Sequence, residues 1–120
     1  LNGEFQGSLI DHISDLPQKA YKNCCSLSVA RIYKSRPVLD VELSGYQIIQ
    51  TLMEQFINAA VYPERFYSKH LISRVSSQYD IDAPDLETRI MAIIDYISGM
   101  TDVYALDVYQ KINGISLPII

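Results

Sequence analysis

The segment from Val38 to Tyr62 constrains the fold most strongly, because its apolar residues recur at the spacing of one face of an α-helix. The apolar face comprises Val41, Gly45, Ile48, Ile49, Leu52, Phe56, Ala59 and Ala60. The polar stripe comprises Ser44, Gln47, Thr51, Glu54 and Asn58. We therefore expect one long helix here, the most buried of the chain, with Ile48, Leu52 and Phe56 at or near the core.

A second helical stretch precedes this segment. In "SDLPQKAYKNCCSLSVARIYKS", Ser14 or Asp15 is a suitable helix cap, and Pro17 falls near the first turn, where helices accept proline. Arg36-Pro37 is expected to end this helix, because a proline disfavours helical geometry in the residue before it.

Two further stretches follow the long helix. Residues 65–79, "RFYSKHLISRVSSQY", predict a shorter amphipathic helix. Its apolar residues are Phe66, Leu71, Ile72 and Val75. The next stretch runs to Ser98, with Asp82 as its expected cap and Pro84 early in the helix. Its apolar stripe comprises Leu86, Ile90, Ile93, Ile94 and Ile97.

The most helical part of the chain is interrupted by Ser98-Gly99 and Thr101-Asp102. Glycine can close a helix in the left-handed conformation, and the side chain of Thr101 or Asp102 can cap the next one. We therefore expect a joint at Gly99-Met100 and a further helix from about Thr101 to Asn113. A helix joint also exposes backbone N–H groups, so a ligand-facing role for this joint is the alternative interpretation.

The predicted fold is an all-α bundle of four or five helices, with room for a short strand pair near the N-terminus. A length of 120 residues with 48% apolar residues suits a single domain with a real core. A net charge of −4 does not indicate a nucleic-acid partner. No apolar run approaches a membrane span, and no signal peptide is visible, so no membrane partner is expected.

The two cysteines, Cys24 and Cys25, are adjacent in a predicted helix, where a disulfide between them would be strained. We expect at least one to fill core volume, in a protein of the reducing cytoplasm. Neither His12 nor His70 stands at a zinc-site spacing. The stretch beginning at Asp80 lacks the glycine and the glutamate of a calcium loop.

Three segments, in order, resemble the C-terminal region of bacterial dGTPase-type deoxynucleoside triphosphate triphosphohydrolases, which are HD-domain metal-dependent hydrolases. The segments are "NGEFQGSLI" (Asn2–Ile10), "ARIYKSRPVLDVELSGYQIIQTL" (Ala30–Leu52) and "DYISGMTDVYALDVYQKING" (Asp95–Gly114). The most specific parts are Glu42 with Gly45 and Tyr46, and Gly99–Asp102 followed by Tyr104 and Ala105. The family usually has an arginine where Val103 stands, so the resemblance implies no arginine contact there.

The resemblance implies a reaction that cleaves a dNTP to deoxynucleoside and inorganic triphosphate. In the family, a histidine, a His-Asp dipeptide and a distal aspartate hold a divalent metal ion of the magnesium or manganese type, which activates water. These ligands lie upstream of the region matched here. This chain contains no His-Asp dipeptide, since Asp11-His12 has the reverse order. The resemblance therefore implies no catalytic residue and no metal ligand in this chain.

The implied role is that of a helical domain that packs on an upstream HD catalytic domain of the same polypeptide. The resemblance also implies contacts in a homo-oligomer and one wall of a dNTP pocket. The candidates for facing the nucleotide are Glu4, Arg31, Arg36, Asp102 and Tyr104. An arginine offers a triphosphate two parallel hydrogen bonds.

Two other classes of function stay open. One is a non-catalytic helical module that binds another protein through an exposed apolar patch. The other is a self-sufficient enzyme that uses Asp95, Asp102 or the acids of the 80–85 segment, and it requires several of these carboxylates to converge in one cleft. Asp95 and Asp102 would share a face only if the helix ran straight through Gly99.

Overall fold

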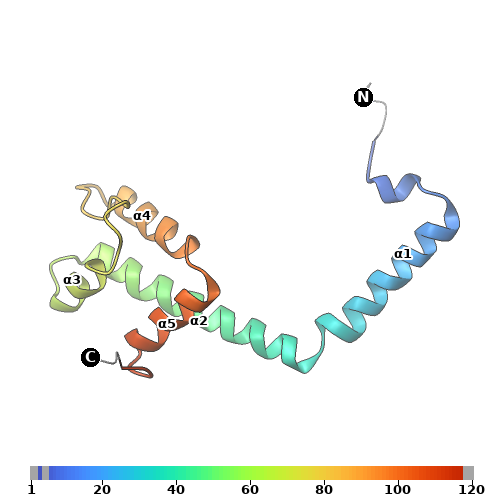
Figure 1. Ribbon diagram of the computed structural model, residues 1–120. Helices are drawn as coiled ribbons and strands as arrows, with labels where there is room; N and C mark the ends of the chain where they lie inside the picture. The colour runs from blue at the N-terminus through green and yellow to red at the C-terminus, as the bar shows by residue number, and fades with distance from the viewer. Residues whose placement is uncertain (1–2, 4–5, 118–120) are drawn as a thin grey trace. The chain divides into compact units, whose positions relative to one another are not determined.

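The computed structural model describes Gly3 and residues 6–117. These residues form five α-helices, a short 3-10 helix and a π-helical turn, and they contain no strand (Figure 1). The prediction of an all-α fold is confirmed, and the short strand pair is not found among these residues. The chain divides into two compact units, Leu1–Glu42 and Leu43–Ile120. Within the described residues, no helix combines the length and the apolar character needed to cross a membrane.

The first unit contains the 3-10 helix Leu9–His12, helix α1 at Asp15–Ser28 and the π-helical turn Val29–Tyr33. Ser14 is the N-cap residue of α1, and Pro17 lies in the first turn, as predicted. None of these three elements contains a buried residue. Cys24 and Cys25 are both exposed and free, so the prediction that one of them fills core volume is wrong.

Helix α2 runs from Arg36 to Val61. Arg36-Pro37 therefore begins this helix as well as following the end of the previous one. Proline lacks an N–H and has a helical φ, so it fits the first turn of a helix without losing a hydrogen bond. Our prediction placed the helix start at Val38 and missed this use of the proline.

Burial along α2 is uneven. The buried residues of this helix are Leu52, Phe56, Ala59 and Ala60, and Ile48 packs partly buried against them. Val41 and Ile49, predicted on the buried face, are exposed. The prediction of the most buried helix therefore holds only for the C-terminal half of α2.

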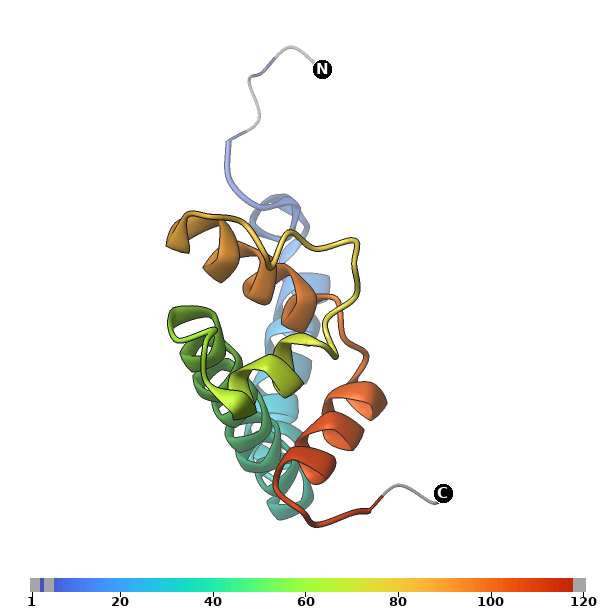
Figure 2. The same ribbon diagram turned by 90° about the vertical axis from the view of Figure 1, so that its left-hand side faces the viewer.

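The second unit gathers α3 (Phe66–Ile72), α4 (Leu86–Ser98) and α5 (Asp102–Ile112) around the C-terminal half of α2, as Figures 1 and 2 show. Its core comprises Leu52, Phe56, Ala59, Ala60, Leu71, Val75, Ile81, Ala92, Ile93, Tyr96, Ile97, Ala105 and Val108. Helix α3 ends well before Tyr79, and the loop after it buries Val75 and Ile81. Phe66, predicted on the apolar stripe, is 80% exposed.

The start of α4 differs from the prediction. Asp85, not Asp82, is the N-cap, and its Oδ2 accepts a hydrogen bond of 2.8 Å from the backbone N–H of Thr88. Hydrogen bonding from the side chain of Thr88, together with the bond from its backbone N–H, lowers the pKa of the Asp85 carboxyl. Pro84 accordingly precedes the helix.

Arg89, in the first turns of α4, joins three parts of the second unit. Its guanidinium donates hydrogen bonds to the carbonyl oxygens of Ala60, Ala83 and Pro84, at 3.1, 2.9 and 3.0 Å. Ala60 lies in the last turn of α2, whose carbonyl groups lack helical partners. Arg89 thus ties the end of α2 to the loop that leads into α4.

Candidate functional site

The joint between α4 and α5 has the predicted geometry. Helix α4 ends at Ser98, and Thr101 is the N-cap of α5. The side-chain oxygen of Thr101 accepts a hydrogen bond of 3.3 Å from the backbone N–H of Tyr104. The predicted break and the Thr101 cap are therefore confirmed. Gly99, however, has a φ of −81°, so it closes α4 without the left-handed conformation that we expected.

Close contact explains why position 99 is a glycine. A Cβ at this position would lie 3.1 Å from the hydroxyl oxygen of Tyr79 and 3.3 Å from the carbonyl oxygen of Asp95. Both distances are shorter than ordinary van der Waals contacts. The glycine therefore lets the Tyr79 side chain reach the helix joint.

Three tyrosines meet beside this glycine. The rings of Tyr79 and Tyr96 pack edge to face with centroids 5.7 Å apart. The hydroxyl oxygens of Tyr96 and Tyr104 are 3.1 Å apart, within hydrogen-bond distance. The Tyr96 hydroxyl also donates to the carbonyl oxygen of Arg74 at 3.4 Å. A buried phenol needs such partners, and these contacts supply them.

Tyr96 is only 6% exposed. Burial raises the pKa of its hydroxyl far above the ordinary value, and the hydrogen bond with Tyr104 acts in the same direction. The Tyr96 hydroxyl is therefore neutral at physiological pH and serves as a hydrogen-bonding group.

A hollow of about 260 Å³ opens at this joint, and we call it the joint hollow. It is lined by Ser76, Gln78, Tyr79, Tyr96, Gly99, Met100, Thr101 and Tyr104. All eight of these residues are uncharged, and they offer aromatic faces, hydroxyl groups and one amide. Such a lining suits a neutral, partly aromatic group better than a phosphate.

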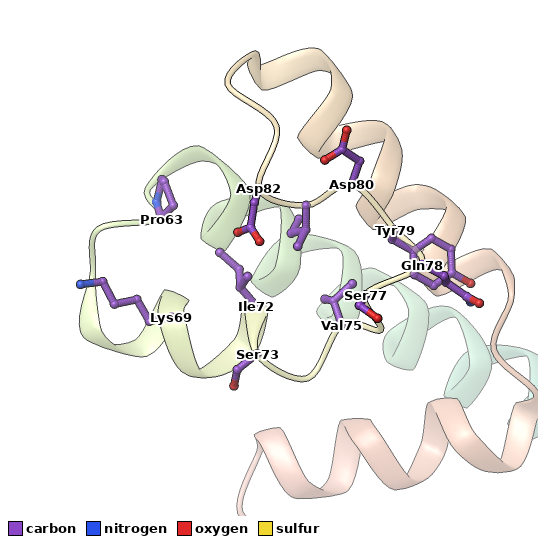
Figure 3. A pocket seen from close by; sticks show the side chains of 11 residues that line it. Pro63, Lys69, Ile72, Ser73, Val75, Ser77, Gln78, Tyr79, Asp80 and Asp82 are labelled. Carbon is purple, nitrogen blue, oxygen red and sulfur yellow. The ribbon is translucent and has the colours of Figure 1, made fainter.

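A larger hollow, of about 750 Å³, lies between α3 and the loop that follows it (Figure 3). Its charged lining residues are Lys69, Asp80 and Asp82. In the view of Figure 3, the carboxylates of Asp80 and Asp82 point to opposite sides of the loop. Among the described residues, no group of three or more histidine, cysteine, aspartate or glutamate side chains could hold a metal ion.

The predicted nucleotide-facing residues fall in different places. Arg31 lies in the π-helical turn and Arg36 is the first residue of α2, and both are exposed. Asp102 and Tyr104 occupy the first turn of α5, but only Tyr104 lines the joint hollow. Glu4 lies outside the described residues.

Tyr79 and Tyr96 are the parts of this site that sequence reasoning missed. One signal could have identified Tyr96: it follows the apolar residues Ile93 and Ile94 and precedes Ile97, so a polar hydroxyl falls within a core stripe. Tyr79 gives no such signal, because it lies in a loop whose path only the folded chain defines.

Fold and site together define an all-α domain with an uncharged hollow at a helix joint. The family model of the phosphohydrolase-associated domain matches residues 13–111. The chain therefore belongs to this family.

Comparison with curated proteins finds relatives that are named for dGTP hydrolysis. The chain is 34% identical to the deoxyguanosinetriphosphate triphosphohydrolase-like protein of Listeria monocytogenes, across 95% of this chain and 28% of that protein. The corresponding protein of Synechocystis sp. is 28% identical, across 98% of this chain and 27% of its own length. The deoxyguanosinetriphosphate triphosphohydrolase of Enterobacter sp. is 23% identical, across 95% of this chain and 28% of its own length.

These matches confirm the predicted resemblance to dGTPase-type proteins. The chain spans little more than a quarter of the length of these relatives. No solved structure matches the chain significantly.

Proposed function

We propose that this chain is the C-terminal domain, residues 1–120, of a triphosphohydrolase that releases deoxynucleoside and inorganic triphosphate from a dNTP. Two findings support the proposal. One is the family match, and the other is the similarity to proteins named deoxyguanosinetriphosphate triphosphohydrolase or deoxyguanosinetriphosphate triphosphohydrolase-like protein. In this proposal, most of the protein, including the HD catalytic domain, lies outside the chain.

A divalent metal ion of the magnesium or manganese type would supply Lewis-acid activation of water in such an enzyme. The described residues of this chain do not fit such an ion, because they offer no suitable group of ligands. The ion would therefore be held by the catalytic domain, and we assign no metal-dependent step to this chain.

The exposed apolar surface of the first unit supports the proposal that this chain packs on the catalytic domain. Leu16 is 81% exposed and Ile32 is 60% exposed. Other exposed apolar residues of this unit are Leu27, Val29, Tyr33, Leu39 and Val41. Burial of one such aliphatic side chain gains about 1.5–3 kcal/mol relative to exposure. We propose that the catalytic domain covers this surface, with further contacts between copies in a homo-oligomer.

The proposed contacts with the nucleotide are those of the residues that the family resemblance indicates. Arg31 and Arg36 are exposed guanidinium groups suited to bidentate hydrogen bonds with a triphosphate. The other residues proposed to face the nucleotide are Asp102 and Tyr104, at the helix joint, and Glu4, near the start of the sequence. The uncharged lining around Tyr104 supports a contact with the nucleoside rather than with its phosphates.

The proposed location is the cytoplasm. Cys24 and Cys25 are free and exposed, and adjacent helical residues do not favour a mutual disulfide. Exposed free thiols persist best in a reducing compartment.

The test compares the 120-residue chain with the whole gene product that carries it. Each protein is incubated with each of the four dNTPs and Mg²⁺ or Mn²⁺, and released triphosphate is measured. We expect release from the whole gene product and none from the chain. Triphosphate released by the chain itself would reveal a catalytic site that the proposal omits.

A helical interaction module without nucleotide chemistry is the second candidate. The exposed apolar side chains of the first unit favour it equally, because a protein partner could cover the same surface. A whole gene product that releases no triphosphate from any dNTP would favour this second candidate.

A further inference from the structure

The apolar stripe of α2 continues beyond the core that covers its C-terminal half. Each residue turns a helix by about 100°, so Gly45 lies within about 20° of both Leu52 and Phe56 around the axis. Leu52 and Phe56 are 0% exposed. Ile49, on the same face, is 46% exposed. A Cβ at Gly45 would meet no atom within 4 Å other than those of its chain neighbours and of the backbone of its own helix. One face of the helix is thus covered at one end and bare at the other.

Nothing in the described structure requires a glycine at position 45. Its backbone is helical, and it is not among the glycines with a positive φ. No neighbouring atom crowds the place of a side chain. Glycine is nevertheless a poorer helix former than alanine. On an apolar face, its advantage is that the backbone or a large side chain of another helix can approach closely.

We propose that Gly45 is the crossing point for a second helix, whose apolar face covers Gly45 and Ile49 and extends the core of the second unit. The occupant is a helix from the catalytic domain of the same polypeptide, and this assignment rests on the function proposed above. The chain spans 28% of the length of a relative such as the Listeria protein, and in a protein of that length the remaining polypeptide would supply the helix. The bare face is also continuous with the buried one, as expected of a core that the present chain only partly contains.

The proposal is tested by whether one substitution raises or lowers the thermal unfolding midpoint. Gly45→Ala is made in the whole gene product, and the thermal unfolding midpoint is measured. On a bare helix, alanine raises the midpoint because it is the better helix former. Against a closely packed helix, the added methyl group forces the two helices apart and lowers the midpoint. We expect a decrease of about 2–4 °C. An increase overturns the proposal.

A larger side chain on either face provides a matched comparison. Gly45→Leu places the side chain at the crossing point, whereas Gln47→Leu places it on an exposed face about 200° away. Hydrogen exchange is followed by mass spectrometry over residues 43–50. We expect Gly45→Leu to speed this exchange roughly 5- to 30-fold, with little change for Gln47→Leu. Equal effects of the two substitutions contradict the proposal.

Two readouts separate the proposal from its alternatives. Protection of residues 43–50 that disappears when the protein is diluted to monomers assigns the face to a second copy and overturns our choice of occupant. Triphosphate release by the unsubstituted protein is measured in parallel. If residues 43–50 are protected in a protein that releases no triphosphate, the proposed function fails while the helix contact at Gly45 stands.

Discussion

The hydroxyl oxygen of Tyr79 lies 3.1 Å from the point that a Cβ on Gly99 would occupy. A loop residue and a helix terminus, twenty positions apart in the sequence, thus come into contact through the absence of a side chain. The contact places the Tyr79 ring beside Tyr96 and helps to shape the joint hollow.

Gly99→Ala is expected to lower the free energy of unfolding by about 1–2 kcal/mol, because the methyl group overpacks the joint. Urea denaturation measures this loss. In a Tyr79→Phe background, the same substitution should be less destabilising, since the nearest atom is gone. If the two effects are simply additive, the contact between these residues does not explain the glycine.

Arg89→Ala should be more destabilising than an ordinary surface substitution. It removes three hydrogen bonds to backbone carbonyls, and we expect a loss of about 2–4 kcal/mol in urea denaturation. Arg65→Ala is the matched control, because Arg65 is exposed and stacks on the Tyr62 ring at 3.9 Å. Arg65→Ala should lower the free energy of unfolding by about 1 kcal/mol or less. Equal losses would show that Arg89 does not join α2 to the loop before α4.

Tyr96 should make stability fall at alkaline pH. Its pKa is raised in the folded protein, so the unfolded chain releases this proton first as the pH rises. The contribution of Tyr96 is fully present below its unfolded pKa of about 10 and declines above it. Between pH 9 and 11, the urea midpoint of a Tyr96→Phe variant should fall less steeply than that of the unsubstituted protein. Parallel pH profiles would show that this phenol is not perturbed.

The two arginines can be tested in the whole gene product by the kinetics of triphosphate release. Arg31→Ala and Arg36→Ala should each lower kcat/KM by roughly 10- to 100-fold, the equivalent of one lost charge-assisted hydrogen bond. Lys34→Ala, between them in the sequence, is the control and should have little effect. If Lys34→Ala lowered kcat/KM as much, the positive charge of this segment as a whole would attract the substrate, and the two arginines would not act as positioned hydrogen-bond donors.

Sequence reasoning succeeded where the cause is local. The break at Gly99 and the cap at Thr101 follow from residue chemistry within a few positions. It misplaced the start of α4, because Asp82 and Asp85 are both suitable caps and only the path of the loop selects Asp85. It proposed Tyr104 as a candidate through the family resemblance, but it could not place Tyr79 and Tyr96 beside this residue.

The sequence by itself determined the helical segments, the joint between the last two, and the burial of Leu52 and Phe56, since spacing and capping act within a helix. Only the tertiary structure decided which parts of the apolar faces are covered. Val41 and Leu52 belong to the same apolar pattern, yet only Leu52 is buried, because burial depends on what packs opposite a side chain. For the same reason, the tyrosine cluster exists only after the loop and two helices have come together.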